Sequence, residues 1–122
     1  MTQLQIQGIK HNPESIIEIA KNNEEQIIFL EIGNSRSGLQ HILKQHEADF
    51  LRRGISKDQI PKLLISAVTQ GKEIGIQGKS RTIYEIGFNG TTQYVSVTIA
   101  NNGYIVGANP TPYYLIRRYT LE

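Results

Sequence analysis

The sequence predicts an α+β domain in which N-terminal helices pack on a C-terminal antiparallel β-sheet meander. Up to about Gly71 the apolar residues recur mainly at helical spacing, and from Lys72 onward they alternate with a period of two. The second half also contains Asn89-Gly90, the dipeptide most typical of a tight β-hairpin. We therefore expect the helices first and the antiparallel strands after them, in a single domain over residues 1–122.

Local signals in the first half predict two strands and three helices. Alternating polar and apolar residues and β-branched runs indicate the strands, whereas capping residues and glycines mark the helix ends. The expected elements are an edge strand over residues 2–9, a helix from Asn12-Pro13-Glu14 to about Asn22, a strand over Ile27–Ile32, a helix over about Ser37–Arg53 that stops at Gly54, and a helix that opens with the capping box Ser56–Gln59 and ends at Gly71.

The second half is expected to form the sheet. In the third of its strands, Val95, Val97 and Ile99 share one face, while Tyr94, Ser96, Thr98 and Ala100 share the other. The expected strands are Glu73–Ile76, Arg81–Phe88, Thr92–Ala100 and Tyr104–Asn109, with a turn at Asn101-Asn102-Gly103 and an additional edge strand in the basic, aromatic tail Tyr113–Tyr119.

Composition excludes several classes of protein. The chain has no cysteine, which removes zinc fingers, thiol enzymes and disulfide scaffolds. Its longest apolar run, Ile27–Leu30, is far shorter than the roughly 20 residues of a membrane span, so we expect a soluble domain with no stable membrane association. The charge is unevenly distributed: residues 1–50 hold 4 basic and 7 acidic side chains, and residues 51–122 hold 9 and 4. A basic surface is therefore expected in the C-terminal half.

The histidines are the strongest candidates for acid–base chemistry. His41 and His46 lie five residues apart on one predicted helix, a spacing that does not suit two ligands of one metal, so neither a metal site nor a cofactor is expected. His46 lies among Leu39, Leu43 and Phe50, which also fits a histidine of the core. His41 is followed by Lys44 one turn later, which fits either a solvated helix face or a general acid or base on a phosphate ester.

The predicted sheet and the tail supply polar and aromatic groups suited to RNA. Cleaving RNA without a metal requires a base, an acid, and donors for the charge that builds on the phosphate. Aromatic side chains can stack on unpaired bases, although tyrosine and threonine are also common in ordinary strands. Our candidates for catalysis here are Arg81 and Thr98, and those for substrate binding are Tyr84, Asn109, Thr111, Tyr113 and Arg117.

Several segments, taken in order, resemble the C-terminal toxin domains of CdiA-type contact-dependent growth inhibition proteins, and more broadly the barnase/EndoU/colicin/RelE-like nuclease superfamily. The resemblance covers about residues 30–110, and its two longest segments are moderately specific in combination. The segments are Glu31-Ile32-Gly33-Asn34, Gly38–His46, Phe50, Gly54-Ile55 and Val97–Pro110.

The resemblance implies a metal-independent ribonuclease, in many relatives one that cleaves transfer RNA, on a barnase-like fold. In the colicin D-like branch a helix histidine and a nearby lysine work opposite a sheet hydroxyl. The matching positions here are His41 or His46, Lys44 and Thr98, although Lys44 follows His41 whereas the lysine of that branch precedes its histidine.

The resemblance also implies a biological setting. Such domains are parts of large secreted exoproteins, act in the cytoplasm of a neighbouring bacterium and are neutralised by a cognate immunity protein. Some relatives require a host translation factor. The alternative that the sequence leaves open is a non-catalytic partner-binding or phage-related domain on the same fold.

Overall fold

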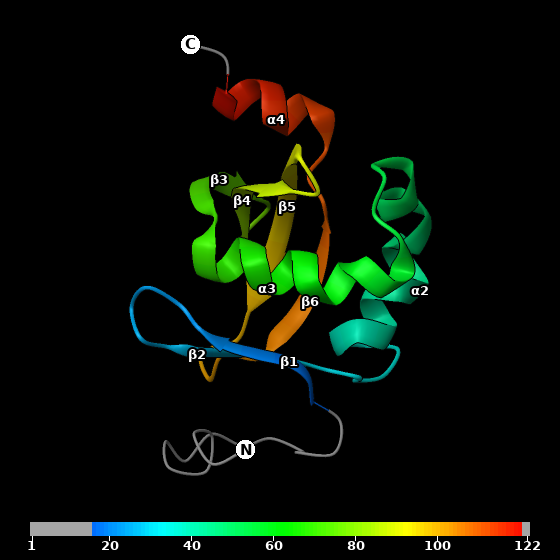
Figure 1. The fold of residues 1–122 in the computed structure, drawn as a ribbon, viewed down its shortest axis with the longest axis vertical. Coiled ribbons are helices and arrows are strands. Elements are labelled where there is room, and N and C mark those ends of the chain that lie inside the picture. The colour runs from blue at the N-terminus through cyan, green and yellow to red at the C-terminus, as the bar shows by residue number, and fades with distance from the viewer. Residues whose placement is uncertain (1–15, 121–122) are drawn as a thin grey trace.

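Three helices pack on an antiparallel four-stranded sheet, with a β-hairpin across one end, in a computed structural model that describes residues 16–120 (Figure 1). The strand order β3-β4-β5-β6 follows the chain, so the sheet is a meander. The elements are β1 (Ile16–Lys21), β2 (Ile27–Glu31), α2 (Gly38–Arg52), the 3₁₀ turn η2 (Lys57–Gln59), α3 (Ile60–Gln70), β3 (Lys72–Gln77), β4 (Arg81–Phe88), β5 (Thr91–Ile99), β6 (Ile105–Pro110) and α4 (Tyr113–Thr120).

Helix α3 covers one face of the sheet. Its buried residues Leu64 and Ala67 belong to one core cluster with Val95 and Val97 of β5 and Ala108 of β6. Alternation along a strand sends these three sheet side chains to the same face, because Val97 and Ala108 are paired in register. The predicted division of faces over residues 94–98 is therefore confirmed.

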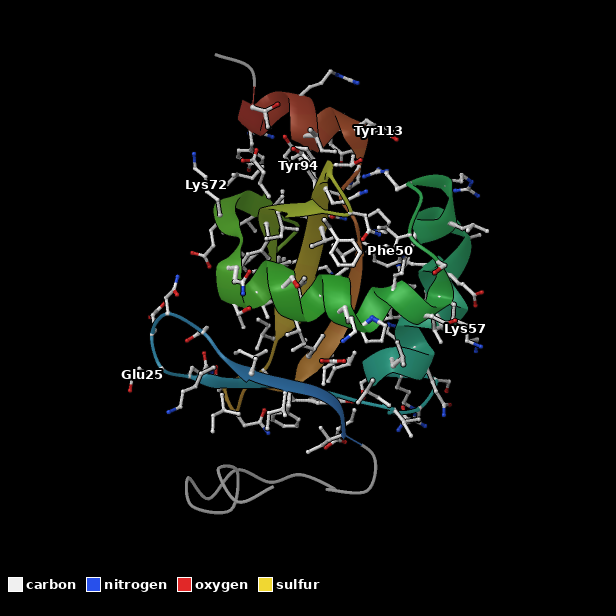
Figure 2. The ribbon with its side chains drawn as sticks, in the orientation of Figure 1. Glu25, Phe50, Lys57, Lys72, Tyr94 and Tyr113 are labelled. Carbon is white, nitrogen blue, oxygen red and sulfur yellow. The ribbon has the colours of Figure 1, made fainter. Side chains whose placement is uncertain are left out.

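Helix α2 stands beside β6, at the edge of the sheet (Figure 1). Ile42 and Phe50, two turns apart, are both buried in the main core. Figure 2 shows the Phe50 ring pointing from α2 toward the space between α3 and the sheet. This contact fixes which side of α2 faces the strands, and it places the histidines of α2 along the same edge.

Helix α4 covers part of the sheet face opposite α3. Its Leu115 is buried, and its Tyr119 ring lies where a Cβ on Gly75 of β3 would be, 2.5 Å from the nearest ring atom. A glycine at position 75 is what allows this close approach. The part of that face that carries Arg81 and Asn109 is left for the candidate site.

The helix expected up to Asn22 is wrong, because Ile16–Lys21 is strand β1 of a hairpin with β2. Three β-branched isoleucines in six residues favour a strand, and pairing with β2 satisfies its backbone groups. The asparagines expected to end a helix form the hairpin turn instead, where Asn22 Oδ1 accepts bonds from the backbone N–H groups of Glu24 and Gln26, both at 2.9 Å. The described chain therefore starts with strands, not helices.

The edge strand expected in the tail is also wrong, because Tyr113–Thr120 forms α4. Pro112 precedes this helix, and its carbonyl accepts the bonds from the N–H groups of Leu115 and Ile116. Arg117 and Arg118 in the last turn suit the negative end of the helix dipole.

The other described elements agree with the sequence. Helix α2, the capping box at Ser56 and Gln59, α3 and the four sheet strands are confirmed within a residue or two, and Asn89-Gly90 forms the β4–β5 turn. The strand expected over residues 2–9 lies outside the described residues. Within residues 16–120, no helix combines the length and the apolar character that crossing a membrane would require.

Gly103 joins the hairpin to the sheet. It has a φ of +93°, and its carbonyl accepts a 2.9 Å bond from the backbone N–H of Phe29 in β2. A Cβ at position 103 would lie 2.0 Å from the carbonyl oxygen of Ile27, which is backbone and cannot swing aside. Any side chain here must push β2 away from the β5–β6 turn.

Gly103→Ala is accordingly expected to lower the free energy of unfolding by about 3 kcal/mol or more, since it combines left-handed strain with a backbone clash. The control is Gly90→Ala, which has a φ of +76° but no atom within 4 Å of the new Cβ and should cost about 1–2 kcal/mol. Urea denaturation measures both. Equal costs would show that the hairpin does not depend on this contact.

Candidate active site

The sheet face opposite α3 carries a row of polar positions. Gln77 of β3 pairs with Arg81 of β4, and Thr98 of β5 pairs with Gly107 of β6. Paired residues point to the same face, and Gly107 precedes Ala108, whose side chain points to α3. The row therefore lies on the other face, with α2 beside it at the β6 edge.

Arg81 is held in this row by the amide side chain of Asn109, which is itself held by Gln77. Its Nη1 donates a 2.5 Å bond to Asn109 Oδ1, and Asn109 Nδ2 in turn donates to Gln77 Oε1 at 3.0 Å and to the Pro110 carbonyl at 2.8 Å. Burial lowers the pKa of the Arg81 guanidinium below its ordinary value, but the group stays charged at neutral pH. Within residues 16–120, no carboxylate forms an ion pair with it. Its charge and most of its donors are thus available to an anion.

His41 lies against the same point of the sheet as Arg81. The position that a Gly107 Cβ would occupy is 2.8 Å from Arg81 Nη2 and 3.6 Å from His41 Cδ2. His41 Nδ1 is 3.0 Å from the Ser35 carbonyl, which can only accept, so Nδ1 carries the proton. Nε2, bonded to Cδ2, is left to exchange a proton beside the guanidinium.

His46 has the same free nitrogen but a different partner. Its Nδ1 donates to Asp49 Oδ2 at 2.9 Å, and Arg52 Nη1 donates to Asp49 Oδ1 at 2.6 Å. The hydrogen bond from His46 lowers the pKa of the Asp49 carboxyl most, and the bond from Arg52 lowers it further, so that it lies below its usual value of 3.8. The carboxylate fixes the orientation of the imidazole and leaves Nε2 free. The alternative that His46 is an ordinary core residue does not hold, since 30% of its side chain is exposed.

Arg81, Asn109, His46 and Asp49 share one cleft of about 530 Å³ between α2, the sheet and the start of α4, and His41 lies beside it at Gly107. Three arginines and one carboxylate give it an excess of positive charge, and the histidine and amides add proton-transfer and hydrogen-bonding groups. Its polar lining consists of His46, Asp49, Arg52, Arg53, Gln77, Arg81, Asn109 and Tyr113.

The structure does not bring four of the predicted residues to this cleft. Tyr84 is buried with the core cluster on the α3 side of the sheet, and burial raises its pKa to about 12. Thr111 is fully buried, with its hydroxyl 2.8 Å from that of Ser96. Lys44 and Arg117 are exposed on α2 and α4 and do not line this cleft.

The remaining predicted residues fall at or beside the cleft. Arg81, His46, Asn109 and Tyr113 line it, His41 lies at Gly107, and half-buried Thr98 is in register with Gly107. The structure thus collects residues from α2, β4, β5 and β6 that are separated by up to about 70 positions along the chain.

Sequence reasoning missed Asp49, Gln77 and Arg53. Asp49 stands three residues after His46, a spacing that puts the two side chains on one helix face and could have revealed the pair. Gln77 and Arg53 carry no comparable signal, because their roles depend on strand register and on where α4 begins.

Within residues 16–120, no group of three or more histidine, cysteine, aspartate or glutamate side chains is placed to hold a metal ion. Among the described residues, the cleft itself presents the His46 imidazole and three guanidinium groups, and the His41 imidazole lies beside it at Gly107. The chain matches no protein-family model and shows no significant match to a curated protein sequence.

Gly107→Ala should disturb the site without unfolding the chain. The new Cβ would meet the far end of the flexible Arg81 side chain, so we expect a loss of stability below about 1 kcal/mol but altered NMR resonances of Arg81 Nε–H and the His41 ring. Gly87→Ala in β4, which meets no atom within 4 Å, is the control. Unmoved resonances in Gly107→Ala would contradict the described packing.

The Asp49 contacts predict a pH dependence of stability. Because the pKa of Asp49 is lower in the folded than in the unfolded chain, its contribution is present above pH 3.8 and is lost as the pH falls through the folded value. The stability difference between wild type and Asp49→Asn should therefore shrink between about pH 5 and about pH 2.5. With 39% of this side chain exposed, the change should be a few tenths of a kcal/mol in urea denaturation. A difference that grows on acidification would contradict the contacts.

Proposed function

We propose that the chain is a metal-independent endoribonuclease that uses His41, His46 and Arg81. The observation that carries this proposal is the pair of histidines on the helix that flanks Arg81. In the part of the chain that the structure describes, each has Nδ1 bonded and Nε2 free, and the Arg81 guanidinium has no carboxylate partner. An acid, a base and a cation are the three groups that RNA cleavage needs when no metal takes part.

The reaction follows from these groups. One imidazole Nε2 removes the proton from a ribose 2′-hydroxyl, whose oxygen attacks the adjacent phosphorus. The bond from phosphorus to the 5′-oxygen breaks, and the other imidazole gives that oxygen a proton. The products are a 2′,3′-cyclic phosphate and a free 5′-hydroxyl. No atom is gained from solvent in this step, and no oxidant or metal is required.

Arg81 is the group that would stabilise the phosphate. A guanidinium can donate two parallel N–H bonds to phosphate oxygens, and its electrostatic attraction to the phosphate becomes stronger when water is excluded. Asn109 and Gln77 hold it in place before substrate arrives, which avoids the cost of reorganising it during the reaction. Thr98, which is in register with Gly107, would add a hydroxyl donor.

We further propose the setting that the family resemblance implies. The meander with helices packed on it is compatible with a barnase-like nuclease fold, although the described chain begins with a hairpin. On this view the domain is a toxin of the contact-dependent growth inhibition type. It would be delivered from a secreted exoprotein and would cleave RNA in the cytoplasm of the target bacterium. Transfer RNA is the leading candidate for its substrate, and a cognate immunity protein would block it.

The proposal predicts that His41→Ala, His46→Ala and Arg81→Ala each lower the rate of RNA cleavage in EDTA by about 100-fold or more. Glu47→Ala is the control, because Glu47 is exposed on α2 and does not line the cleft. Circular dichroism verifies that each variant is folded. Full cleavage by the folded His41→Ala and His46→Ala variants would refute the proposal.

A modified substrate separates the two histidine roles. In an RNA whose 5′-bridging oxygen at the cleavage site is replaced by sulfur, the leaving group needs no proton. Cleavage of this substrate should be restored to near the wild-type rate in the variant that lacks the acid and stay about 100-fold slower in the variant that lacks the base. Equal rescue of both variants would show that the histidines do not divide the proton transfers.

A further inference from the structure

Arg53 and Tyr113, called the ridge below, line both the candidate active-site cleft and a second cleft. The second cleft has a volume of about 340 Å³ and shares Arg52, Arg53 and Tyr113 with the first. Figure 2 shows Tyr113 at the end of α4 that lies on the side of α2. A polymer bound in the first cleft can therefore continue over the ridge into the second.

The ridge is rigidly built. Arg53 Nη2 donates a 2.7 Å bond to the carbonyl of buried Thr111, and the Arg53 carbonyl accepts a 3.1 Å bond from Gln93 Nε2. The guanidinium carbon of Arg53 then lies 4.1 Å from the centre of the Tyr113 ring. One face of that ring is covered by a fixed cation, while 61% of the residue remains exposed. An open aromatic face is thus held in place before any ligand arrives.

The second cleft has the polarity of a nucleotide site. Among the described residues, its lining includes Arg53 and Arg52, the latter bonded to Asp49, and no acidic side chain. This balance of charge favours a phosphodiester backbone. Thr91 and Thr92 add uncharged hydroxyl groups of the kind that bind sugars and base edges.

We propose that Tyr113, backed by Arg53, stacks on the base of a nucleotide that flanks the scissile phosphate, and that the second cleft holds the next part of the strand. This inference rests on the proposed ribonuclease function and specifies its substrate. A base can stack on a side chain only when it is unpaired, so the substrate is a single-stranded segment or loop of RNA. Sequence-tolerant recognition of the flanking base follows, because every base offers a flat face.

The test uses a probe that binds but cannot react. A fluorescein-labelled 2′-O-methyl hexaadenylate lacks the 2′-hydroxyl nucleophile, and fluorescence anisotropy gives its dissociation constant. We expect Tyr113→Ala to raise this constant about tenfold, the usual effect of losing one stacked base. Tyr114→Ala is the matched control, since Tyr114 is the next residue, is 63% exposed and lines neither cleft. It should change the constant by less than about twofold.

Probes that lack bases separate stacking from charge. In a set of hexamers, each lacks the base at a different position. At one of these positions, loss of the base should weaken binding to wild type about tenfold but barely weaken binding to Tyr113→Ala. A fully abasic hexamer, with the same charge, should bind wild type and Tyr113→Ala equally. Two results would overturn the proposal: equal effects of Tyr113→Ala and Tyr114→Ala, or equal binding of abasic and complete hexamers. Binding at this surface would then depend on charge alone, and an acidic polypeptide would fit it equally well.

The two proposals fail separately, because binding of this probe does not depend on catalysis. RNA cleavage by wild type with no specific effect of Tyr113→Ala on binding overturns the base site alone. Stacking on Tyr113 by a wild type that cleaves no RNA supports the base site and overturns the ribonuclease function.

Discussion

The hydrogen bond from Arg81 to Asn109 is the interaction on which the rest of the candidate site depends. A half-buried guanidinium without a carboxylate partner in the described chain loses hydration, and this loss must be offset by polar contacts. Asn109 supplies one such contact and is itself fixed by Gln77 and the Pro110 carbonyl. A carboxylate at position 109 would hold the cation more strongly but would neutralise it. The amide holds Arg81 and leaves its charge for a ligand.

This arrangement constrains the fold around it. Arg81, Asn109 and Gln77 come from three strands, so the meander register must be kept for Asn109 to meet both the guanidinium and Gln77. Gly107 must lack a side chain, because the guanidinium occupies the space above it. Helix α2 must lie along β6, and the burial of Ile42 and Phe50 secures it there and brings His41 to Gly107. Packing on one side of the sheet thereby positions chemistry on the other.

The sequence predicted the regular elements whose signals are local. The period of two in β5, the Asn89-Gly90 turn and the capping box at Ser56 depend on neighbouring residues and were correct. Residues 16–21 and 113–120 were assigned wrongly because each segment is short and amphipathic in either conformation. Contacts with residues far along the chain therefore decide whether it forms a strand or a helix. For residues 16–21 the partner is β2. For α4 it is the sheet, through the contact of Tyr119 with Gly75. Arg81 and His46 could be chosen by residue type, but Gln77 and Arg53 could not, because only strand register and tertiary packing give them a role.

The central claim is that two histidines and an arginine cleave RNA without a metal. The most direct measurement is incubation of the purified chain with total RNA in excess EDTA, followed by mapping of the new RNA ends. The account predicts discrete fragments that end in 2′,3′-cyclic phosphates and begin with 5′-hydroxyls, cut within unpaired segments. Intact RNA, or cleavage that requires added Mg²⁺ and leaves 3′-hydroxyl ends, would contradict it.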